Sequence, residues 1–411
     1  MNIVYINNFA GSKKFGMELR PYYLCKNWVR SGNSVSIIAS SFVHTRTTQP
    51  EVSKNFQKEV IEGIDYYWIK CPKYTGLGLI RLISFSLFIL RLMLKSRFVA
   101  KNLKPEIVIA SSTYLWDIFP ALLISKFANA KLVYEFPDIE PLTIIQNFNY
   151  SPYHPIIWFM SLTEKFIYKI SDLVVCVLPN GYAHMKKFGL PKERYMLIPN
   201  GIDVQTWEDS KMQIPEELEE TISNYKKENI FLVGYAGYIS KQNALETMIA
   251  TADKLRNEKI HFIVIGDGPN RENLLKLKNE KKLENITFFG RIAKESVPTF
   301  LSKMDALFIA FNKLQLYEYG VNTNKLYDYM MQGKPVIQSQ NAGNDLVSEG
   351  KCGISCPAED PEAVANGILR LKGLTSEERE KIGANGRSHV LGNYTYQILS
   401  EKYLRGIEKL R

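Results

Sequence analysis

The chain has 411 residues, of which 45% are hydrophobic and 23% charged, and its 52 Lys and Arg against 42 Asp and Glu give a net charge of +10. This composition excludes a disordered chain and provides enough apolar residues for the cores of two or three domains. The five cysteines are Cys25, Cys71, Cys176, Cys352 and Cys356. They show no CxxC and no zinc-type spacing, and five scattered thiols favour a reducing cytosol.

Short apolar segments that predict strands alternate with longer helical segments along the whole chain. In the first half these segments are 3–6, 34–39, 107–110, 131–134, 173–177 and 196–198. In the second half they are 231–236, 261–265, 286–288, 306–310, 335–338 and 353–355. This alternation predicts the α/β class with two doubly wound parallel sheets, joined by a polar stretch near 203–228. The first strand follows no basic or long apolar leader, so we expect no signal peptide.

The positive charge is concentrated in one segment of the first half. Between Tyr66 and Pro105 there are eight basic residues and no acidic one, and they surround the apolar run 82–90. That run is too short to span a bilayer, because a membrane helix needs about 20 apolar residues. A helix within residues 77–104 is typical of a surface that meets anionic lipid, and it does not indicate nucleic-acid binding. The alternative is a helix packed on a sheet, with its basic side chains reaching solvent.

Two predicted strands lead into glycine-containing turns, where free backbone N–H groups favour anions. In the first turn, residues 7–16, Gly16 allows a ligand close to the backbone and Lys14 adds positive charge. With Glu18 just beyond, these residues form the predicted acceptor or phosphate loop. The second turn is 266–269. Neither turn matches GxGxxG or a P-loop, which disfavours a nicotinamide or ATP site, and a plain tight turn is the alternative at each.

The segment 317–337 has the pattern of a ligand-binding helix start. Residues 322–324 form a polar turn before a helix that ends at Gly333, and an Asn or Thr caps it. Lys325 then lies in the first turn, where a positive side chain is unfavourable to the helix dipole. The placement becomes favourable if an anion lies there, held by free N–H groups and by Lys325. Asp328, one turn further on the same side, can accept two hydrogen bonds from a ribose diol.

The order of these motifs resembles that of a known family. It is similar to the retaining, GT-B-fold glycosyltransferases of family four (group one), and within them to the bacterial branch that builds O-antigen and capsule units, such as the L-fucosaminyltransferases. The motifs lie at 16–24, 198–203, 237–241, 265–269, 324–330 and 333–337. The resemblance implies two Rossmann-like domains that face each other across a cleft. The acceptor-binding domain would be 1–205, with a C-terminal helix 390–411 crossing back onto it, and the nucleotide-sugar-binding domain 206–389.

The resemblance also implies a donor site in the second domain. Asp328 takes the place of the second acidic residue of the family's E-x7-E motif and would bind the ribose. Lys241 and Lys325, with the backbone around them, would neutralise the diphosphate. Arg291 lies where the family's base-binding loop begins, and the turn 341–344 matches a loop near the donor. The complete implied donor set is Lys241, Arg291, Glu318, Asn322, Asn324, Lys325, Leu326 and Asp328.

The chain departs from the family's pattern at two donor positions. The position of the first motif glutamate is Gly320; Glu318 is nearby, and whether it substitutes is open. The arginine that often precedes the diphosphate lysine corresponds to Tyr238. The charge of the leaving group would then rest on the lysines, Arg291 and helix N–H groups.

In the first domain, the stretch 133–141 matches the family's acceptor side. Asp138 is kept in this stretch, and Glu135 adds a second carboxylate. Either group could take or orient the proton of the acceptor hydroxyl, so Asp138 and Glu135 are the predicted catalytic residues. The chain has no DxD motif, and we expect no metal and no cofactor other than a UDP-sugar as co-substrate.

The sequence therefore predicts a glycosyltransferase that moves an N-acetylated hexose or deoxyhexose from a UDP-sugar, with retention implied by the family. The expected acceptor is a polyprenyl-diphosphate-linked saccharide of surface polysaccharide synthesis. The expected location is the cytoplasmic face of a bacterial cell membrane, with residues 77–104 against anionic lipid. Three alternatives stay open: a UDP-sugar epimerase of similar fold, a dinucleotide oxidoreductase, and an inactive nucleotide-sugar-binding scaffold, which fits the loss of the first motif glutamate.

Overall fold

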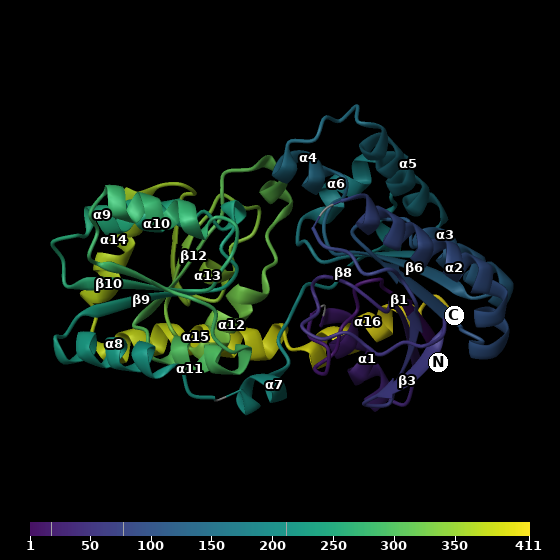
Figure 1. The fold of residues 1–411 in the computed structure, drawn as a ribbon, viewed down its shortest axis with the longest axis horizontal. Coiled ribbons are helices and arrows are strands. Elements are labelled where there is room, and N and C mark those ends of the chain that lie inside the picture. The colour runs from purple at the N-terminus through teal and green to yellow at the C-terminus, as the bar shows by residue number, and fades with distance from the viewer. Residues whose placement is uncertain (18, 77, 211) are drawn as a thin grey trace. The chain divides into compact units, whose positions relative to one another are not determined.

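The computed structural model describes residues 1–17, 19–76, 78–210 and 212–411. The chain divides into two compact units, each built on its own sheet (Figure 1). Unit 1 comprises Met1–Asn200 and Tyr396–Arg411, and unit 2 comprises Gly201–Thr395. The sequence placed these limits after residue 205 and before residue 390. The predicted α/β class with two Rossmann-like parallel sheets is confirmed.

Unit 1 contains an eight-stranded sheet within the described residues, in the order β3-β4-β2-β1-β5-β6-β7-β8. The strands are β1 Asn2–Ile6, β2 Ser34–Ser40, β3 Gln57–Ile61, β4 Ile64–Ile69, β5 Ile107–Ser111, β6 Lys131–Phe136, β7 Leu173–Cys176 and β8 Tyr195–Leu197. All neighbours pair in parallel except β3 and β4. β5 and β7 are buried along their whole length, as expected for a parallel sheet with helices on both faces.

The hairpin of β3 and β4 was not among the predicted strands. β4 carries Tyr66 and Trp68, which are completely buried, but polar residues interrupt the apolar pattern of both strands. Phe56 and Glu62, both with positive φ, flank β3. Sequence reasoning looked for apolar runs between helices, and an antiparallel edge strand with one solvated face has none.

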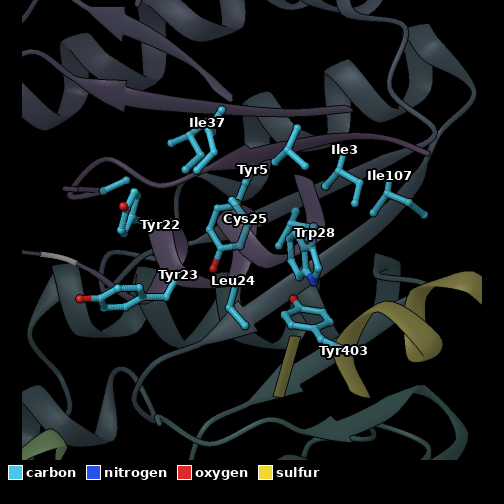
Figure 2. Packing of buried hydrophobic residues seen from close by; sticks show 14 of the residues in the cluster. Ile3, Tyr5, Tyr22, Tyr23, Leu24, Cys25, Trp28, Ile37, Ile107 and Tyr403 are labelled. Carbon is cyan, nitrogen blue, oxygen red and sulfur yellow. The ribbon is translucent and has the colours of Figure 1, made fainter. Parts of the chain in front are cut away.

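One face of the unit 1 sheet is covered by the first and last helices of the chain, α1 (Arg20–Arg30) and α16 (Tyr396–Glu408). Figure 2 shows the packing of this core around Tyr5, Trp28 and Tyr403. The rings of Trp28 and Tyr403 meet edge to face, with centroids 5.2 Å apart, and Trp28 Nε1 donates to the Ser400 carbonyl (3.0 Å). The last helix is therefore an integral part of the unit 1 core.

The remaining helices of unit 1 lie in the crossovers after β4. They are α2 Leu79–Leu103, α3 Ile118–Ala128, α4 Leu142–Phe148, α5 Pro155–Ile170, α6 Gly181–Lys187 and the 3-10 turn η1 Lys192–Arg194. α2 packs along α3, and Phe119 of α3 stacks with Phe159 and Phe166 of α5. α2, α3 and α5 thus form one layer (Figure 1). In the part of the chain that the structure describes, no helix is both long and apolar enough to cross a bilayer.

Unit 2 contains a six-stranded parallel sheet in its described part, in the order β11-β10-β9-β12-β13-β14. The strands are β9 Phe231–Ala236, β10 Ile260–Ile265, β11 Ile286–Phe289, β12 Ala306–Ala310, β13 Val336–Ser339 and β14 Gly353–Cys356. The helices are α7 Val204–Asp209, α8 Glu216–Lys227, α9 Leu245–Lys254, α10 Arg271–Glu280, α11 Val297–Ser302, α12 Asn324–Gln332, α13 Leu346–Glu349, α14 Pro361–Lys372 and α15 Ser376–Asn393. Short 3-10 turns are η2 Lys241–Asn243, η3 Lys294–Ser296 and η4 Gln315–Tyr319.

In both sheets the strand order reverses next to the first strand of the unit. In unit 1 the reversal lies between β1 and β5, and in unit 2 between β9 and β12. Ligands of open α/β sheets bind beyond the carboxyl ends of the strands at such a reversal. The loops after β1, β5 and β9, with the start of α12, are therefore the places to look for function.

Candidate functional site

The centre of the unit 2 site is the ammonium group of Lys325 in the first turn of α12. Its Nζ donates to the hydroxyl of Tyr235 (2.6 Å) and to Oδ1 of Asn243 (2.5 Å), and it lies 4.5 Å from the centre of the Tyr235 ring. Among the described residues, no carboxylate forms an ion pair with it, and burial lowers the pKa of Lys325 to about 7. A half-buried cation without a counter-ion is expensive unless an anion joins it.

The start of α12 is open as well. Thr323 precedes the helix, and its side chain makes no capping hydrogen bond. The first N–H groups of a helix have no partner within it and carry partial positive charge. The first turn of α12 therefore holds both Lys325 and N–H groups that favour an anion.

Glycines make room for this lysine and for the loops below it. A Cβ on Gly237 would lie 2.7 Å from Cδ of Lys325, so only glycine fits under that side chain. Gly266 and Gly268 are explained by backbone contact, because a Cβ on either would lie within 2.3 Å of a carbonyl oxygen of the 237–239 loop. The N–H of Ile239 donates across this contact to the Asp267 carbonyl (2.9 Å). The predicted phosphate turn 266–269 is thus a packing turn that supports the loop beside Lys325.

Asp328 lies one turn after Lys325, as predicted. Burial raises the pKa of Asp328 to about 7, and the charge of Lys294 in η3 acts against that shift. The following residue, Tyr329, accepts a hydrogen bond from the Ala236 N–H at its hydroxyl (2.9 Å), which fixes α12 to the end of β9. The structure therefore holds a titratable carboxyl and a buried ammonium on the same short helix.

The other implied donor residues lie around α12 with different exposures. Lys241 is exposed in η2, and its carbonyl accepts from the Asn312 side chain (2.8 Å). Arg291 is exposed and lies 3.8 Å from a carboxylate oxygen of Asp267. Asn322 accepts a hydrogen bond at Oδ1 from the Tyr327 hydroxyl (2.8 Å).

The other implied residues of the 318–326 segment differ in how exposed their side chains are. Asn324 is exposed, whereas Leu326 is buried in the core and contributes only its backbone. Glu318 is exposed in η4. Gly320, at the position of the first motif glutamate, has a φ of 102°, a conformation in which any residue with a side chain is strained. The backbone thus disfavours a glutamate at this position.

The turn 341–344 supports the same helix from the other side. The side-chain amide of Asn344 accepts from the Val321 N–H (2.8 Å) and donates to the Val321 carbonyl (3.1 Å). The Gly343 N–H donates to the Tyr317 carbonyl (2.8 Å). These bonds fix the loop before α12, so Asn344 positions the site through the backbone.

Three partners of the unit 2 site were missed in the sequence. Tyr235 and Asn243 hold the ammonium of Lys325, and Lys294 acts on Asp328. Tyr235 is a strand residue in an apolar run, and Lys294 is one of many surface lysines. Asn243 could have been suspected from the sequence, because it lies two residues after the predicted donor residue Lys241, in the same 3-10 turn η2.

In unit 1, the predicted catalytic residue Glu135 is a counter-ion in the core. Its carboxylate accepts from Nε and Nη2 of Arg20, at 3.0 Å each, and from the hydroxyl of Tyr5 (2.6 Å). Arg20 also donates to the carbonyls of Pro199 and Ile198, at 2.6 and 2.8 Å. Glu135 is 1% exposed and Arg20 is 7% exposed. The structure therefore gives Glu135 a structural role, and Asp138 alone is left as the catalytic candidate.

Asp138 follows β6 and is half-buried. Burial raises the pKa of the neighbouring Glu140, and the charge of Asp138 raises it further. The residues of the predicted acceptor loop contact other residues of unit 1. Lys14 forms an exposed ion pair with Glu59 (2.6 Å). Gly16 has a φ of 87° and lies beside Thr47. Glu18 lies outside the described residues.

Comparisons with known proteins agree with this arrangement. Residues 16–206 match the model of "Glycosyltransferase Family 4", and residues 230–372 match that of "Glycosyl transferases group 1". The probable glycosyltransferase WbjE of Pseudomonas aeruginosa is 24% identical over 253 residues, which is 60% of each chain. A protein of Escherichia coli named for colanic acid biosynthesis, WcaI, is 26% identical over 117 residues, 28% of each chain. The match to the first of these relatives thus spans about 60% of its length.

Solved structures share the fold over the complete chain. Anabaena Alr3699/HepE, determined in complex with UDP and glucose, has a TM-score of 0.68 at 15% identity and covers 99% of both chains. One family model matches most of unit 1 and the other most of unit 2, and together they leave residues 1–15, 207–229 and 373–411 unmatched. The chain therefore belongs to the GT-B glycosyltransferases of family 4.

Proposed function

We propose that the protein transfers a sugar from a UDP-sugar to a saccharide acceptor. The observation that carries this proposal is the ammonium of Lys325, held under the open start of α12 by Tyr235 and Asn243 without a carboxylate partner in the described part of the chain. A nucleoside diphosphate supplies the missing negative charge. The UDP and glucose bound to Anabaena Alr3699/HepE support this class of donor.

The chemistry of the transfer fits these residues. Breaking the bond between sugar and phosphate leaves negative charge on the diphosphate, and preoriented N–H groups and an ammonium stabilise that charge. In our proposal, Lys325 and the first turn of α12 stabilise the charge of the diphosphate. The exposed side chains of Lys241 and Arg291 add further positive charge. Asp328 binds the ribose diol. Because these cations meet the diphosphate charge, the proposal needs no metal, and it predicts that EDTA leaves the rate unchanged.

Asp138 is the group that we assign to the acceptor hydroxyl. It is half-buried and follows the carboxyl end of β6. A carboxylate at this position can accept or orient the proton of the attacking hydroxyl. We further propose retention of the anomeric configuration, as is implied by the family, and NMR of the anomeric proton of the product tests it.

We propose an N-acetylated hexose or deoxyhexose as the transferred sugar and a lipid-linked saccharide as the acceptor, in bacterial surface polysaccharide synthesis. The name of the Escherichia coli relative supports the pathway class. Exposed apolar residues on the helix layer of unit 1 support a lipid-linked acceptor. On α2, Leu90, Leu94 and Phe98 are 53%, 77% and 46% exposed, and on α5 Trp158 is 61% exposed.

The charge of that layer supports an anionic lipid surface at the cytoplasmic face of the membrane. The four helices α2 to α5 contain eight Lys and Arg and a single acidic residue, Glu164. Glu164 is 2% exposed and accepts hydrogen bonds from Tyr168 and His184, so it presents no charge to solvent. Cations above an apolar surface are attracted to anionic headgroups. The sequence predicted only residues 77–104, and the exposed residues of α5 extend the proposed surface.

Calorimetry with UDP, GDP and ADP tests the proposal at its centre. We expect UDP to bind wild-type protein and to bind Lys325→Met much more weakly, while the exposed lysine variant Lys276→Met serves as the matched control. Absence of UDP binding to the wild type contradicts the proposal. Binding without release of UDP from any UDP-sugar identifies the inactive scaffold that Gly320 would fit, and a new UDP-sugar without free UDP identifies an epimerase.

A further inference from the structure

Both partners of the Lys325 ammonium donate to the same backbone carbonyl. The Tyr235 hydroxyl donates to the Tyr238 carbonyl (2.8 Å), and Nδ2 of Asn243 donates to the same oxygen (3.0 Å). Nδ2 of Asn243 also donates to Oγ of Ser240 (2.9 Å). The loop after β9 thereby fixes how the Tyr235 hydroxyl and the Asn243 amide are oriented.

These bonds leave only oxygen lone pairs on the side of Lys325. A phenol has one O–H donor, and a side-chain amide has two N–H donors. The Tyr235 hydroxyl and Nδ2 of Asn243 have used their donors on the loop. Their oxygens therefore accept from Nζ of Lys325, at 2.6 and 2.5 Å. An ammonium group donates and never accepts, so the two oxygens match the charged form of the lysine.

One N–H group of the Lys325 ammonium is left over. An ammonium group has three donors, and Tyr235 and Asn243 accept from two of them. In the described part of the chain, no other acceptor lies within hydrogen-bond distance of Nζ. Gly237 closes one side of the group, because a Cβ there would lie 3.1 Å from Nζ. The remaining N–H group is therefore available to an acceptor that a ligand brings.

Both partners of the lysine are also uncharged. Burial raises the pKa of Tyr235 well above its ordinary value, so the hydroxyl keeps its proton. Asn243 has the shape of an aspartate but carries no charge. An aspartate at this position would place a carboxylate against the ammonium of Lys325, and that ion pair would cancel the positive charge that attracts an anionic ligand. The amide therefore holds the lysine without neutralising it.

We propose that Tyr235 and Asn243 are positioning residues of the donor site: as uncharged acceptors they hold the ammonium of Lys325 in place and leave its charge and one N–H group to the diphosphate. This inference rests on the proposed function and adds what keeps the donor site cationic. The two residues act through Lys325 and need no contact with the donor. The amide of Asn243 determines that the site accepts an anion, and a carboxylate at this position would disfavour one.

UDP calorimetry on Tyr235→Phe and Asn243→Asp, each alone and combined with Lys325→Met, tests whether the two residues act through the lysine. We expect Tyr235→Phe, which removes one acceptor and keeps the ring, to bind UDP about threefold more weakly. Asn243→Asp should bind UDP at least about tenfold more weakly. In the Lys325→Met background, Tyr235→Phe should have no further effect and Asn243→Asp a much smaller one. Asn279→Asp makes the same change of charge at an exposed position of α10 and should bind UDP like the wild type.

An NMR titration of the Lys325 Cε signal provides a second readout, which needs no nucleotide, and Lys325→Met assigns that signal. The new carboxylate of Asn243→Asp should raise the pKa of Lys325 above the wild-type value of about 7, because a negative charge favours the ammonium form. Tyr235→Phe should lower this pKa, since the ammonium loses an acceptor. Local unfolding would instead expose the lysine and raise its pKa in both variants.

Two results would overturn the inference. One is a loss of UDP affinity in Tyr235→Phe that is equally large with and without Lys325. The other is a pKa of Lys325 that rises in both variants or changes in neither. A wild-type protein that does not bind UDP contradicts the proposed function, and the NMR titration still decides whether Tyr235 and Asn243 hold a charged lysine.

Discussion

The carboxyl edges of the two sheets have the same architecture and opposite electrostatics. At the unit 2 edge, Lys325 has no carboxylate partner among the described residues, and burial lowers its pKa to about 7. At the unit 1 edge, Asp117 and Glu140 are acids without a paired cation in the described residues. The first is our proposed diphosphate site, and the second holds, within the part of the chain that is described, no positive group that would attract an anion. One fold thus places opposite electrostatics at equivalent strand reversals.

A third buried charge in unit 1 shows what distinguishes a site from a core. Arg20 and Glu135 are buried like Asp117 and Glu140, but they satisfy each other, and Arg20 also donates to the surrounding carbonyls. Burial alone therefore does not identify a functional group. A missing partner does, and the following experiments test that distinction from the largest expected effect to the smallest.

The balanced pair should be the most sensitive to substitution. Glu135→Gln leaves the guanidinium of Arg20 buried without a counter-ion, and we expect it to destabilise the protein by about 3–5 kcal/mol in urea unfolding. Lys58→Gln, which removes an exposed ion pair with Asp65, is the control and should cost less than about 1 kcal/mol. Equal effects of the two substitutions would show that Glu135 is not a structural counter-ion.

An unbalanced acid should behave in the opposite way. The unfolded chain ionises Asp117 from about pH 4, whereas the folded chain ionises it near pH 7, so stability falls over this range. We expect Asp117→Asn to stabilise the protein at about pH 8 by on the order of 2–4 kcal/mol. Thermal unfolding across pH should show this gain disappearing toward about pH 4. A destabilised variant at the higher pH would mean that a partner for the carboxylate exists.

The unbalanced lysine should matter for binding more than for stability. Lys325→Met removes a charge-assisted contact to the diphosphate, and we expect UDP affinity in calorimetry to fall roughly 10- to 100-fold. Because burial lowers the pKa of Lys325 to about 7, its charged form costs stability at lower pH. The variant should therefore melt no earlier than the wild type at about pH 6. Unchanged UDP affinity would remove Lys325 from the donor site.

The smallest effect concerns the lipid surface. Lys95 lies over the ring of Phe98 on α2, and one cation near an anionic membrane contributes about 1 kcal/mol. We expect Lys95→Gln to bind phosphatidylglycerol vesicles about fivefold more weakly in cosedimentation at low salt. The exposed control Lys276→Gln should match the wild type. Binding that does not differ between anionic and neutral vesicles would contradict the docking surface.

The parallel strands other than β4 could be predicted because they form apolar runs that the local sequence displays. The β3–β4 hairpin could not, since its residues alternate and its partner strand is decided by tertiary pairing. Lys325 and Asp328 could be predicted as site residues because both lie at the start of one helix, where the sequence spacing alone indicates their role. Asn243 and Tyr235 were missed because they reach Lys325 from 82 and 90 residues away.

The same reason explains why the ion pair of Glu135 was missed. Its motif context suggested a free carboxylate, but Arg20 meets it across 115 residues of chain. No local pattern distinguishes a buried counter-ion from a proton acceptor. Asp117 gave no signal either. Burial raises its pKa to about 7, a hydrogen bond from the Asn8 backbone acts against that shift, and neither is visible in the local sequence.

The place of α16 has a consequence for how the polypeptide folds as it is synthesised. Unit 2 is one continuous stretch of the sequence. Unit 1 is complete only with Tyr403, the partner of Trp28, which follows unit 2 in the sequence. While the ribosome translates residues 201–395, the nascent first unit keeps an uncovered aromatic surface. We therefore expect unit 2 to complete its folding before unit 1, although unit 1 is translated first. Chaperones should then bind the incompletely folded unit 1.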